Sequence, residues 1–574
     1  MKLHNFVQSK FKSVFKTFSR LSTVCSCRVF ANTRVATLLF VLLLIGIAQG
    51  AMAAHPRIVN IYNFIRNEDF RMANAEEIMF ETTRNQIELI KPTGLPATWA
   101  LEYDALMNPR YQKLLKEQLS PKDEIGVWWE IPQILVEKAG LKWRGQHQWD
   151  PASDVGFSPG YTPEERRKLV DVYMADFKSI FGYYPKSVGS WFIDEVTLEY
   201  MAERYGVVAA CNCKDQVGTD GYTLWGGYWN QAYYPSRVNS YMPAQTKKGQ
   251  IQIPVFRMLG SDPIYQHGTT PGLLSLEPVY GNAGASSNWV AWFMDNLIHQ
   301  PSLAFGYTQV GQENSFGWKA MKDGLTMQIA MLDKLAKAGD VKVMTLQQAG
   351  TWFKKHYSQT PPTSVVCMSD WKNENRRTVW YDSRFYRLNL LWENGGFFIR
   401  DFHGFDEKYV SPTHETPLKG NTMTFHTLPF MDWALWHDSG KTQAGMWPVL
   451  VSADGKDSAM AIDGVPVIKE QLKKRLSISQ PLRGGGAVKI VCHENSLVFT
   501  AVDAHRKPLK WGWKLVGGKP QSSAVQWVDS NAVHYEQAGI VYALETKVGS
   551  CEETKDGAIL LKSDKSGKLV LTLR

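Results

Sequence analysis

The sequence contains few cysteines for its length, seven in 574 residues, and two of them precede residue 30. The other five form an odd, widely spaced set, which excludes the disulfide framework of small secreted domains. A single bridge between Cys492 and Cys551 stays open in an oxidising compartment. Cys211 and Cys213 lack the second pair that a zinc site of this spacing needs, so we interpret them as packing residues.

A strong excess of one charge is also missing from most of the chain. The whole sequence has 64 basic and 55 acidic residues, but residues 1–34 hold seven Lys or Arg and no acid. The rest therefore carries 57 basic residues against 55 acidic ones. This balance gives no reason to expect a nucleic-acid partner.

The chain has no apolar run long enough for a comfortable membrane span. The run VATLLFVLLLIGIAQG follows the basic N-terminus and ends before the small residues AMA at 51–53. A basic, an apolar and a small-residue segment in this order are typical of a secretory signal. We therefore predict a signal over residues 1–53, a periplasmic or secreted mature chain and no stable membrane span after cleavage, with an uncleaved anchor as the alternative.

Short repeats, low-complexity segments and nucleotide-binding fingerprints are absent as well. We find no G-x-S-x-G, P-loop or dinucleotide motif in a fitting context, and expect no cofactor. Over residues 54–360, apolar runs with strand character alternate with helical patterns in about seven β-α units. We predict an α/β fold in this part, a distorted seven-stranded (β/α) barrel. Over 365–574, short alternating runs split by Gly, Asn and Asp predict an all-β sandwich domain.

Polar residues follow the predicted strands, at the positions where the strands of a parallel barrel converge on one mouth. They are, in chain order, Asn63, Arg66, Glu102, Glu130, Asp194, Arg257, Asp262 and Glu313. Several carboxylates at one mouth raise each other's pKa values, which is unfavourable unless they are used. Two carboxylates in different surroundings can act as nucleophile and general acid in glycoside hydrolysis.

Asp194 stands at a strand-to-helix junction in the stretch SVGSWFIDEVTLEYMAERYG. We predict a strand over 187–193 and a helix over 195–205 that ends at Gly206. Two interpretations stay open from this position. Asp194 is either a catalytic carboxylate at the barrel mouth or the N-cap of the helix, because Asp is a favoured N-cap residue.

The segment after the fifth predicted strand, residues 213–239, interleaves aromatic residues with Gly and Asn. Such loops often form binding walls, and flat aromatic faces stack on pyranose rings. The alternative is a loop that folds inward and packs on the barrel. As candidate sugar-contacting residues in this loop we take Asp220, Trp225, Trp229 and Tyr234.

Several strand-end motifs resemble those of the polysaccharide deacetylase-like superfamily, whose relatives include glycoside hydrolase families 38 and 57. PATWALEYDAL and KDEIGVWWEI resemble the second and third strands of the deacetylases. GSWFIDEVTLEYMAERYGV is similar to the strand-four motif of families 38 and 57, whose nucleophile matches Asp194. QENSFGW, at Glu313, resembles a late family 57 segment beside the acid residue.

Longer phrases, among them GTDGYTLWGGYW and VFRMLGSDPIY, resemble a branch of secreted bacterial proteins in this superfamily. Its members pair such a barrel with a C-terminal β domain, and the resemblance covers most of the mature chain. Metal-dependent deacetylases need an Asp pair after the first strand and a His-x-x-x-His pair after the third. NFIRNED and VWWEI stand there instead, without His, so we expect no metal.

These observations favour a carbohydrate-active enzyme, a metal-independent glycoside hydrolase acting on an oligo- or polysaccharide through two carboxylates. A metal-dependent polysaccharide deacetylase and a non-catalytic glycan-binding protein are the alternatives. Asp194 is the expected nucleophile, Glu313 the acid/base and Glu130 the reserve for the acid role. Trp191 would shape the pocket. The remaining strand-end residues, Asn63, Arg66, Glu102, Arg257 and Asp262, would hold the substrate.

We predict that the exported protein begins close to Ala54, because the small residues at 51–53 form the cleavage site. N-terminal sequencing of the protein recovered outside the cytoplasm measures this directly. An exported chain that still starts at Met1 would contradict the prediction.

Overall fold

The computed structural model describes residues 55–574, apart from 267–273, 426, 439–442, 453–455, 472–473, 519–523 and the side chain of residue 219. The predicted signal at 1–53 lies outside the described residues. Residues 55–574 form one compact unit. In this part of the chain, no helix has both the length and the apolar character needed to cross a bilayer.

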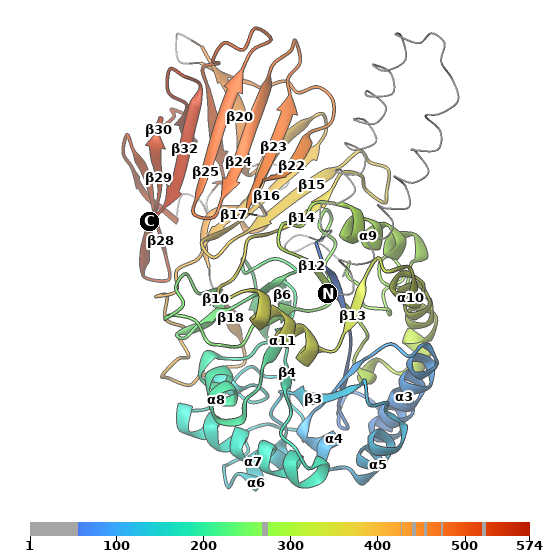
Figure 1. Ribbon diagram of the computed structural model, residues 1–574. Helices are drawn as coiled ribbons and strands as arrows, with labels where there is room; N and C mark the ends of the chain where they lie inside the picture. Colours follow the sequence, from blue (N-terminus) through green and yellow to red (C-terminus); the bar gives the residue numbers. More distant parts are fainter. Residues whose placement is uncertain are drawn as a thin grey trace, which may run out of the picture. The chain divides into compact units, whose positions relative to one another are not determined.

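The first half of this unit is built on a barrel-like parallel sheet (Figure 1). Its strands lie in the order β12-β1-β2-β3-β4-β5-β11. They are β1 (Arg57–Ile65), β2 (Thr98–Leu101), β3 (Glu124–Trp128), β4 (Ser187–Gly189), β5 (Ala209–Asn212), β11 (Val255–Arg257) and β12 (Gly306–Val310). Among the described residues no pairing joins β11 to β12, so the barrel-like sheet is nearly, but not fully, closed. The predicted α/β character of this half is confirmed.

Two further strands extend the sheet beyond what the sequence indicated. β8 (Ala232–Tyr233) pairs antiparallel with β11, and β13 (Lys342–Met344) pairs with the first half of β1. The second and fourth strands are also shorter than predicted. Residues 96–106 contain β2 and then the helix α4 (Tyr103–Met107), and β4 ends at Gly189 rather than at residue 193. In both places, the chain bends directly after the strand and a helix follows.

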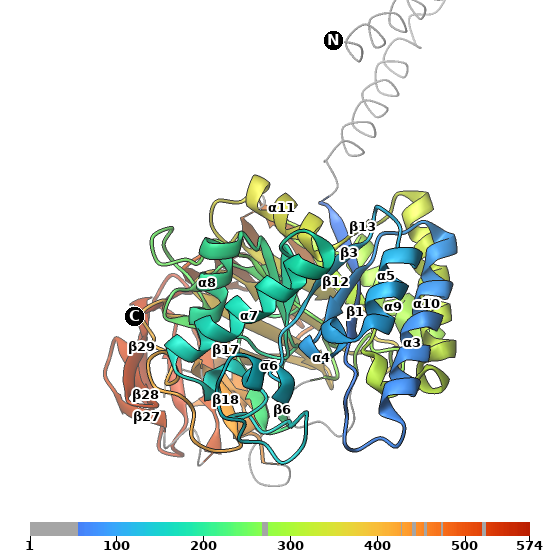
Figure 2. The same cartoon turned by 90° about the horizontal axis from the view of Figure 1, so that it is seen from below.

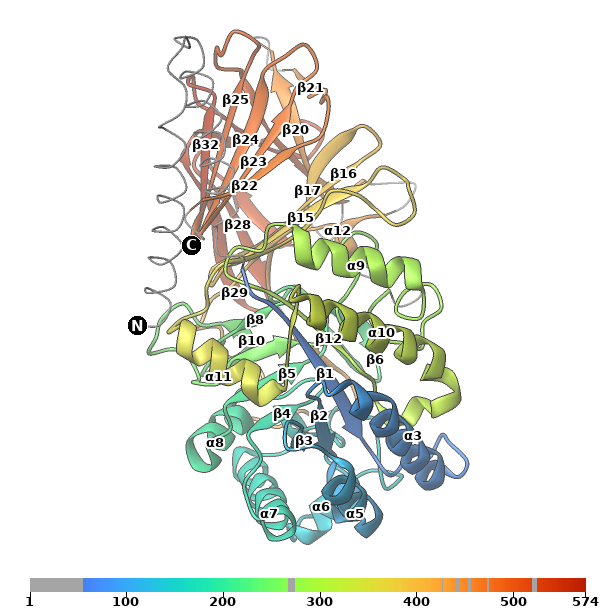
Figure 3. The same ribbon diagram turned by 45° about the vertical axis from the view of Figure 1, so that its right-hand side comes forward.

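Helices cover the outside of the sheet (Figures 2 and 3). They are α3 (Ala75–Ile90), α5 (Pro109–Gln118), α6 (Gln133–Lys138), α7 (Pro163–Phe181), α8 (Glu195–Tyr205), α9 (Ser287–His299) and α10 (Trp318–Ala338). The sequence of α7 shows how local signals predict where a helix begins and ends. Thr162 and Glu165 form a capping box, Pro163 begins the helix, and Gly182 ends it at a φ of 86°.

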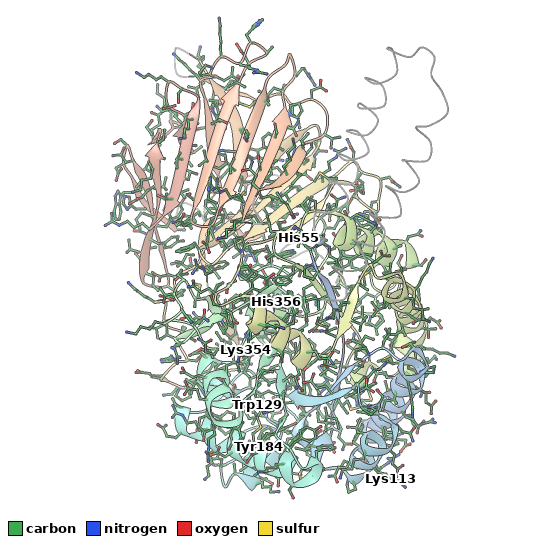
Figure 4. All side chains as sticks on the ribbon, in the orientation of Figure 1. His55, Lys113, Trp129, Tyr184, Lys354 and His356 are labelled. Carbon is green, nitrogen blue, oxygen red and sulfur yellow. The ribbon has the colours of Figure 1, made fainter. Side chains whose placement is uncertain are left out.

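Two apolar cores lie on the two faces of the sheet. Along β1, Tyr62 and Phe64 point inward, while Ile61 and Ile65 point outward to the helices. The short helix α11 (Leu346–His356) contacts β1 and β5, and its residues Leu346, Ala349 and Phe353 belong to the inner core. Trp129, labelled in Figure 4, belongs to the outer core, with its ring 6.0 Å from that of Tyr173 on α7.

The second half is an all-β region of antiparallel sheets, as predicted from its short alternating runs. One sheet runs β14-β15-β16-β17-β20-β26-β31-β30, and the other runs β22-β23-β24-β25-β32-β29-β28-β27. The strands used below are β15 (Arg377–Asp382), β16 (Tyr386–Glu393), β17 (Gly396–Gly404), β25 (Ser496–Val502) and β26 (Trp511–Val516). Phe499 of β25 and Trp513 of β26 have ring centroids 5.5 Å apart, so side chains of the two sheets contact each other.

The aromatic segment 213–239 folds inward, as the packing alternative had it. Trp225, Trp229 and Tyr234 are at most 5% exposed. Trp229 stacks on Trp380 of β15 with ring centroids 3.8 Å apart, and the indole N–H of Trp225 donates to Asp432. Trp225 and Trp229 therefore attach the barrel to the β region, and Tyr234 packs on Phe353 of α11 with ring centroids 5.1 Å apart, in contrast to the predicted role of these residues on a sugar.

The attachment is completed by a short sheet built from distant parts of the chain. β6 (Gln216–Thr219) and β7 (Tyr222–Leu224) form a hairpin, and β18 (Met423–Phe425) pairs parallel with β7. The segment leading to β18 also contacts the barrel, because Leu418 N–H donates to Pro159 and Arg166 donates to the carbonyl of Thr413. The C-terminal half thus supplies part of the wall beside the strand ends.

A buried ionic network lies at the same junction. The carboxylate of Asp215 accepts from Arg257 at 2.6 Å, from Tyr241 at 2.8 Å and from Arg387 of β16. Arg387 also donates to both carboxylate oxygens of Asp401 on β17. Burial opposes ionisation of Asp215, but Arg387 and Arg257 hold its pKa below the usual range. Arg257 is thereby a structural residue and not the substrate-binding residue expected.

We predict that Asp215→Asn lowers the free energy of unfolding by about 3–5 kcal/mol, because it leaves two buried guanidinium groups without their shared carboxylate. Urea denaturation followed by tryptophan fluorescence measures the loss. Asp556→Asn is the matched control, since Asp556 forms an exposed ion pair with Lys514 and should change stability by less than about 1 kcal/mol. Equal effects of the two substitutions would contradict a large contribution of Asp215 to stability.

Candidate active site

Four charged side chains gather where β1, β2, β3 and β12 end. Arg66 follows β1, Glu102 follows β2, Glu130 follows β3 and Glu313 follows β12. All four are at most 6% exposed. The expectation that strand ends would bring these residues together is met by their geometry. We refer to Arg66, Glu102, Glu130 and Glu313 as the mouth cluster.

Arg66 is the centre of the mouth cluster. Its guanidinium nitrogens lie 3.6 Å from Glu130, 3.4 Å from Glu313 and 3.7 Å from Asp69. The guanidinium carbon also lies 4.3 Å from the ring centroid of Trp149. Burial disfavours the charged form, but these carboxylates and Glu102 raise the pKa of Arg66 above its ordinary value. A fixed positive charge therefore sits among carboxyl groups.

Glu130 has a full set of donors. One carboxylate oxygen accepts from the indole N–H of Trp128 at 3.0 Å, and the other accepts from the indole N–H of Trp149. Together with Arg66, these contacts come from three directions and fix the orientation of the carboxylate.

Glu313 lies in different surroundings. Its oxygen nearest to Arg66 is buried and accepts no hydrogen bond from the described residues. Burial raises the pKa of Glu313, as do Glu130 and Glu277, while Arg66 and Ser315 act in the opposite direction. A carboxyl group with a raised pKa and an oxygen that accepts no hydrogen bond is suited to carry a proton to another molecule.

Glu102 is buried beside Asp104. Neither carboxylate oxygen of Glu102 accepts a hydrogen bond from the described residues. Asp104 itself accepts from the backbone of Asn67 and Ala105. Burial, Asp104 and Glu130 raise the pKa of Glu102 well above its ordinary value. This raised pKa favours the protonated form of Glu102.

Two charged residues at the mouth were missed by sequence reasoning. Lys214, two residues beyond β5, forms a buried ion pair with Glu277 at 3.0 Å. Glu277 also accepts from Ser275 at 2.7 Å and influences the pKa of Glu313. The position of Lys214 just after a strand was a usable signal. Glu277 stands in a long irregular segment, where no periodicity marks a site.

Asp194 is the N-cap of α8, the second of the two interpretations left open. One oxygen accepts from Thr197 N–H at 2.9 Å and from Arg166 at 3.0 Å, and the other accepts from the hydroxyls of Thr197 and Ser158. The side chain is 1% exposed. With both oxygens engaged in this way, Asp194 has no lone pair directed at a substrate, so the geometry favours the cap over the nucleophile.

Asn63 and Asp262 do not face the mouth as expected. Asn63 lies on the outer face of β1 with Ile61 and Ile65, and accepts from Gln86 of α3. Asp262 is fully buried and accepts from two backbone N–H groups and from the indoles of Trp289 and Trp371. Both oxygens of Asp262 therefore serve the local fold, and the alternation along β1 explains the position of Asn63.

Trp191 and Asp220 do remain near the site. Trp191 is partly exposed and stands edge-on to Trp128 and Phe64, with ring centroids 5.4 and 5.3 Å away. Asp220 is exposed at a φ of 43° and lies 3.5 Å from Arg71. Of the predicted contact residues, Arg66, Glu102 and Trp191 thus retain a place at the mouth, with Asp220 on its rim.

The mouth cluster does not suit a zinc ion of the deacetylase kind. Its possible ligands are carboxyls alone, and the Arg66 guanidinium lies 3.6 and 3.4 Å from two of them, where it would repel a cation. Within the described ranges, no group of three His, Cys, Asp or Glu side chains is arranged to hold a metal.

Comparison with known proteins gives distant structural likenesses. No family model and no curated protein matches the sequence. A protein from Parabacteroides distasonis, provisionally called a glycoside hydrolase/deacetylase, is 17% identical with a TM-score of 0.48, over 65% of this chain and 90% of that one.

Two further solved structures are more distant. A provisionally named polysaccharide deacetylase from Mycobacterium smegmatis is 12% identical with a TM-score of 0.35, over 54% of this chain and 94% of that one. A family 4 acetyl xylan esterase from Clostridium thermocellum is 10% identical with a TM-score of 0.25, over 53% and 94%. With TM-scores below one half, these likenesses assign neither a family nor an activity.

We predict that Glu102→Gln becomes increasingly favourable as the pH rises from 5 to 8. The raised pKa of Glu102 means that the folded chain keeps a proton that the unfolded chain releases above a pH of about 4.3. Stability therefore falls with rising pH until the folded-state pKa is reached, by up to about 1.4 kcal/mol per pH unit. The amide of Gln can donate to Asp104 without this cost.

Thermal unfolding midpoints across the pH range measure the effect. Glu137→Gln, on an exposed position of α6, is the control and should follow the wild-type curve. A constant difference between Glu102→Gln and wild type at every pH would show that Glu102 holds no such proton.

Proposed function

We propose that the protein is a hydrolase of carbohydrates that cleaves glycosidic bonds with two carboxyl groups, Glu313 as general acid and Glu130 as carboxylate partner. The observation that carries this proposal is the contrast between the two residues. Both carboxyls lie beside Arg66, but Glu130 is also held by two indole N–H groups, while Glu313 has a raised pKa and a buried oxygen that accepts no hydrogen bond from the described residues. Pairs of carboxyls whose environments differ in this way divide into acid and base.

The spacing of the two groups supports the assignment. Their oxygens lie 3.6 and 3.4 Å from nitrogens of one guanidinium, so they are within about 10 Å of each other, which covers the separations used by retaining and inverting glycosidases. Glu313 would give its proton to the leaving oxygen as the bond to the anomeric carbon breaks. Glu130 would either attack that carbon or take a proton from the water that attacks it.

The surroundings of the mouth cluster support a sugar ligand. Trp191 is partly exposed beside Trp128, and Tyr280, also partly exposed, lies close enough to Glu277 and Glu313 for both to raise its pKa. Flat apolar faces beside fixed polar groups are typical of ligand sites. A mature protein in the periplasm or outside the cell, as the predicted signal implies, would meet polysaccharide there.

Removal of acyl groups from a polysaccharide is the second candidate. Arg66 favours it, because a buried guanidinium can stabilise the oxyanion of acyl transfer. The metal-dependent version lacks support from the donors at the mouth. A third candidate, glycan binding without turnover, would use the same surface. The two hydrolytic candidates differ in their product, a new reducing end or free acetate.

We predict that Glu313→Gln lowers kcat on a cleaved glycan by roughly 10²–10⁴-fold, because the leaving oxygen loses its proton donor. Release of reducing ends from a glycan library measures the activity. Glu137→Gln is the control and should keep full activity. Retention of activity in Glu313→Gln would contradict the proposal, and acetate release that a chelator abolishes would replace it with the metal-dependent deacetylase.

A further inference from the structure

A concave surface lies at the border between the barrel and the β region. This cleft has a volume of about 590 Å³, within the size range of ligand sites. Its lining includes three aromatic residues and three cations, namely Tyr265, Trp371, Trp433, Lys372, Arg376 and Arg400. We call it the junction cleft. None of these residues belongs to the mouth cluster.

Arg400 gives the junction cleft an unbalanced buried charge. It is 3% exposed, and its guanidinium donates to Asn389 and to the carbonyls of Ile264 and Pro263. No carboxylate of the described residues lies within ion-pair distance of it. Burial lowers the pKa of Arg400 to about 10, although three neighbouring carboxylates act in the opposite direction. A buried cation without a paired anion is unfavourable, and an anion bound nearby would relieve it.

The two other cations stand over aromatic rings. Lys372 Nζ lies 4.2 Å from the ring centroid of Tyr265, and the guanidinium carbon of Arg376 lies 5.2 Å from the same ring. Arg376 pairs with Glu393, the one carboxylate among the described lining residues of the cleft, and with Glu374 beside the cleft. The described lining therefore holds three cations and one carboxylate beside aromatic faces, a combination that suits an anionic sugar.

The junction cleft and the mouth cluster are linked by one short stretch of chain. Glu277 pairs with Lys214 at the mouth, and Tyr280 feels the charges of Glu277 and Glu313. Asn282, two residues further on, lines the cleft. Residues 277–282 therefore connect the two places along the chain.

We propose that the junction cleft binds an anionic part of a glycan, a uronate or sulfated sugar, away from the bond that is cleaved. This inference rests on the proposed function for the identity of the ligand as a carbohydrate. The mouth carries more carboxylates than cations, so the sugar at the scissile bond is uncharged, and the negative charge of the polymer is held at the cleft. The substrate class is then a polysaccharide in which neutral and acidic sugars alternate or are grouped.

Calorimetric binding to the full mature chain tests the proposal without any turnover. The probes are a uronate hexasaccharide, a sulfated hexasaccharide and a neutral hexasaccharide, each at low and moderate salt. We expect at least one anionic probe to bind ten or more times tighter than the neutral one, with an affinity that falls as salt rises. Comparison of the two anionic probes shows whether carboxylate or sulfate is preferred.

The double variant Lys372→Ala/Arg376→Ala should lose at least tenfold in affinity for the preferred anionic probe. The control with the same change in charge is Lys354→Ala/Lys355→Ala, on exposed positions of α11 outside the cleft, where Lys354 and His356 are labelled in Figure 4. It should stay within twofold of wild type.

Three outcomes would overturn the proposal: equal binding of neutral and anionic probes, unchanged binding by the cleft variant, or an equal loss in the α11 control. Because hydrolysis is not measured, a failure of Glu313 as the acid leaves this result untouched. Conversely, an intact glycosidase without anionic binding would contradict the junction cleft alone.

Discussion

The buried carboxylate of Asp215 is the contact on which the arrangement of the two halves depends. It holds Arg257 from the end of β11 and Arg387 from the β region in one network, at a position almost closed to water. The aromatic segment around it then packs on β15 through Trp229 and Trp380. Because buried charges are tolerated only when they are paired, this network specifies one mutual position of barrel and β region. The wall beside the strand ends is a consequence of that position.

Buried charges at the mouth must also be paired, but there one cation is shared by several carboxyl groups. Arg66 is this cation, and the protein meets the shortage of positive charge in two ways. Glu130 receives indole N–H groups, and the pKa values of Glu102 and Glu313 are both raised. The chemistry proposed for the site comes from this inequality, since identical carboxyls could not divide the work of acid and base.

Sequence reasoning succeeded where one local pattern decides the structure. The capping box and Gly182 marked α7, and apolar runs located the strands, so the strand-end residues Arg66, Glu102, Glu130 and Glu313 could be assigned to one mouth from the sequence alone. It failed where the partner is far away in the chain. No sequence pattern near Asp194 predicts its contact with Arg166, and none near Trp229 predicts its contact with Trp380. Asn63 was misjudged by one residue of strand alternation, which is enough to reverse a side chain.

The pairing of β18 with β7 also affects the order in which parts of the chain can fold. Residues 222–224 find their partner strand about 200 residues later, at 423–425, which is a contact of high sequence separation. A chain that emerges from its N-terminus can build the early β-α units, but the wall beside the strand ends must wait for the second half. During that interval the apolar surface of β7 and its neighbours stays uncovered. The mouth can therefore be completed only when the second half has been synthesised. A truncated polypeptide would have an incomplete barrel that exposes apolar surface and is prone to aggregate.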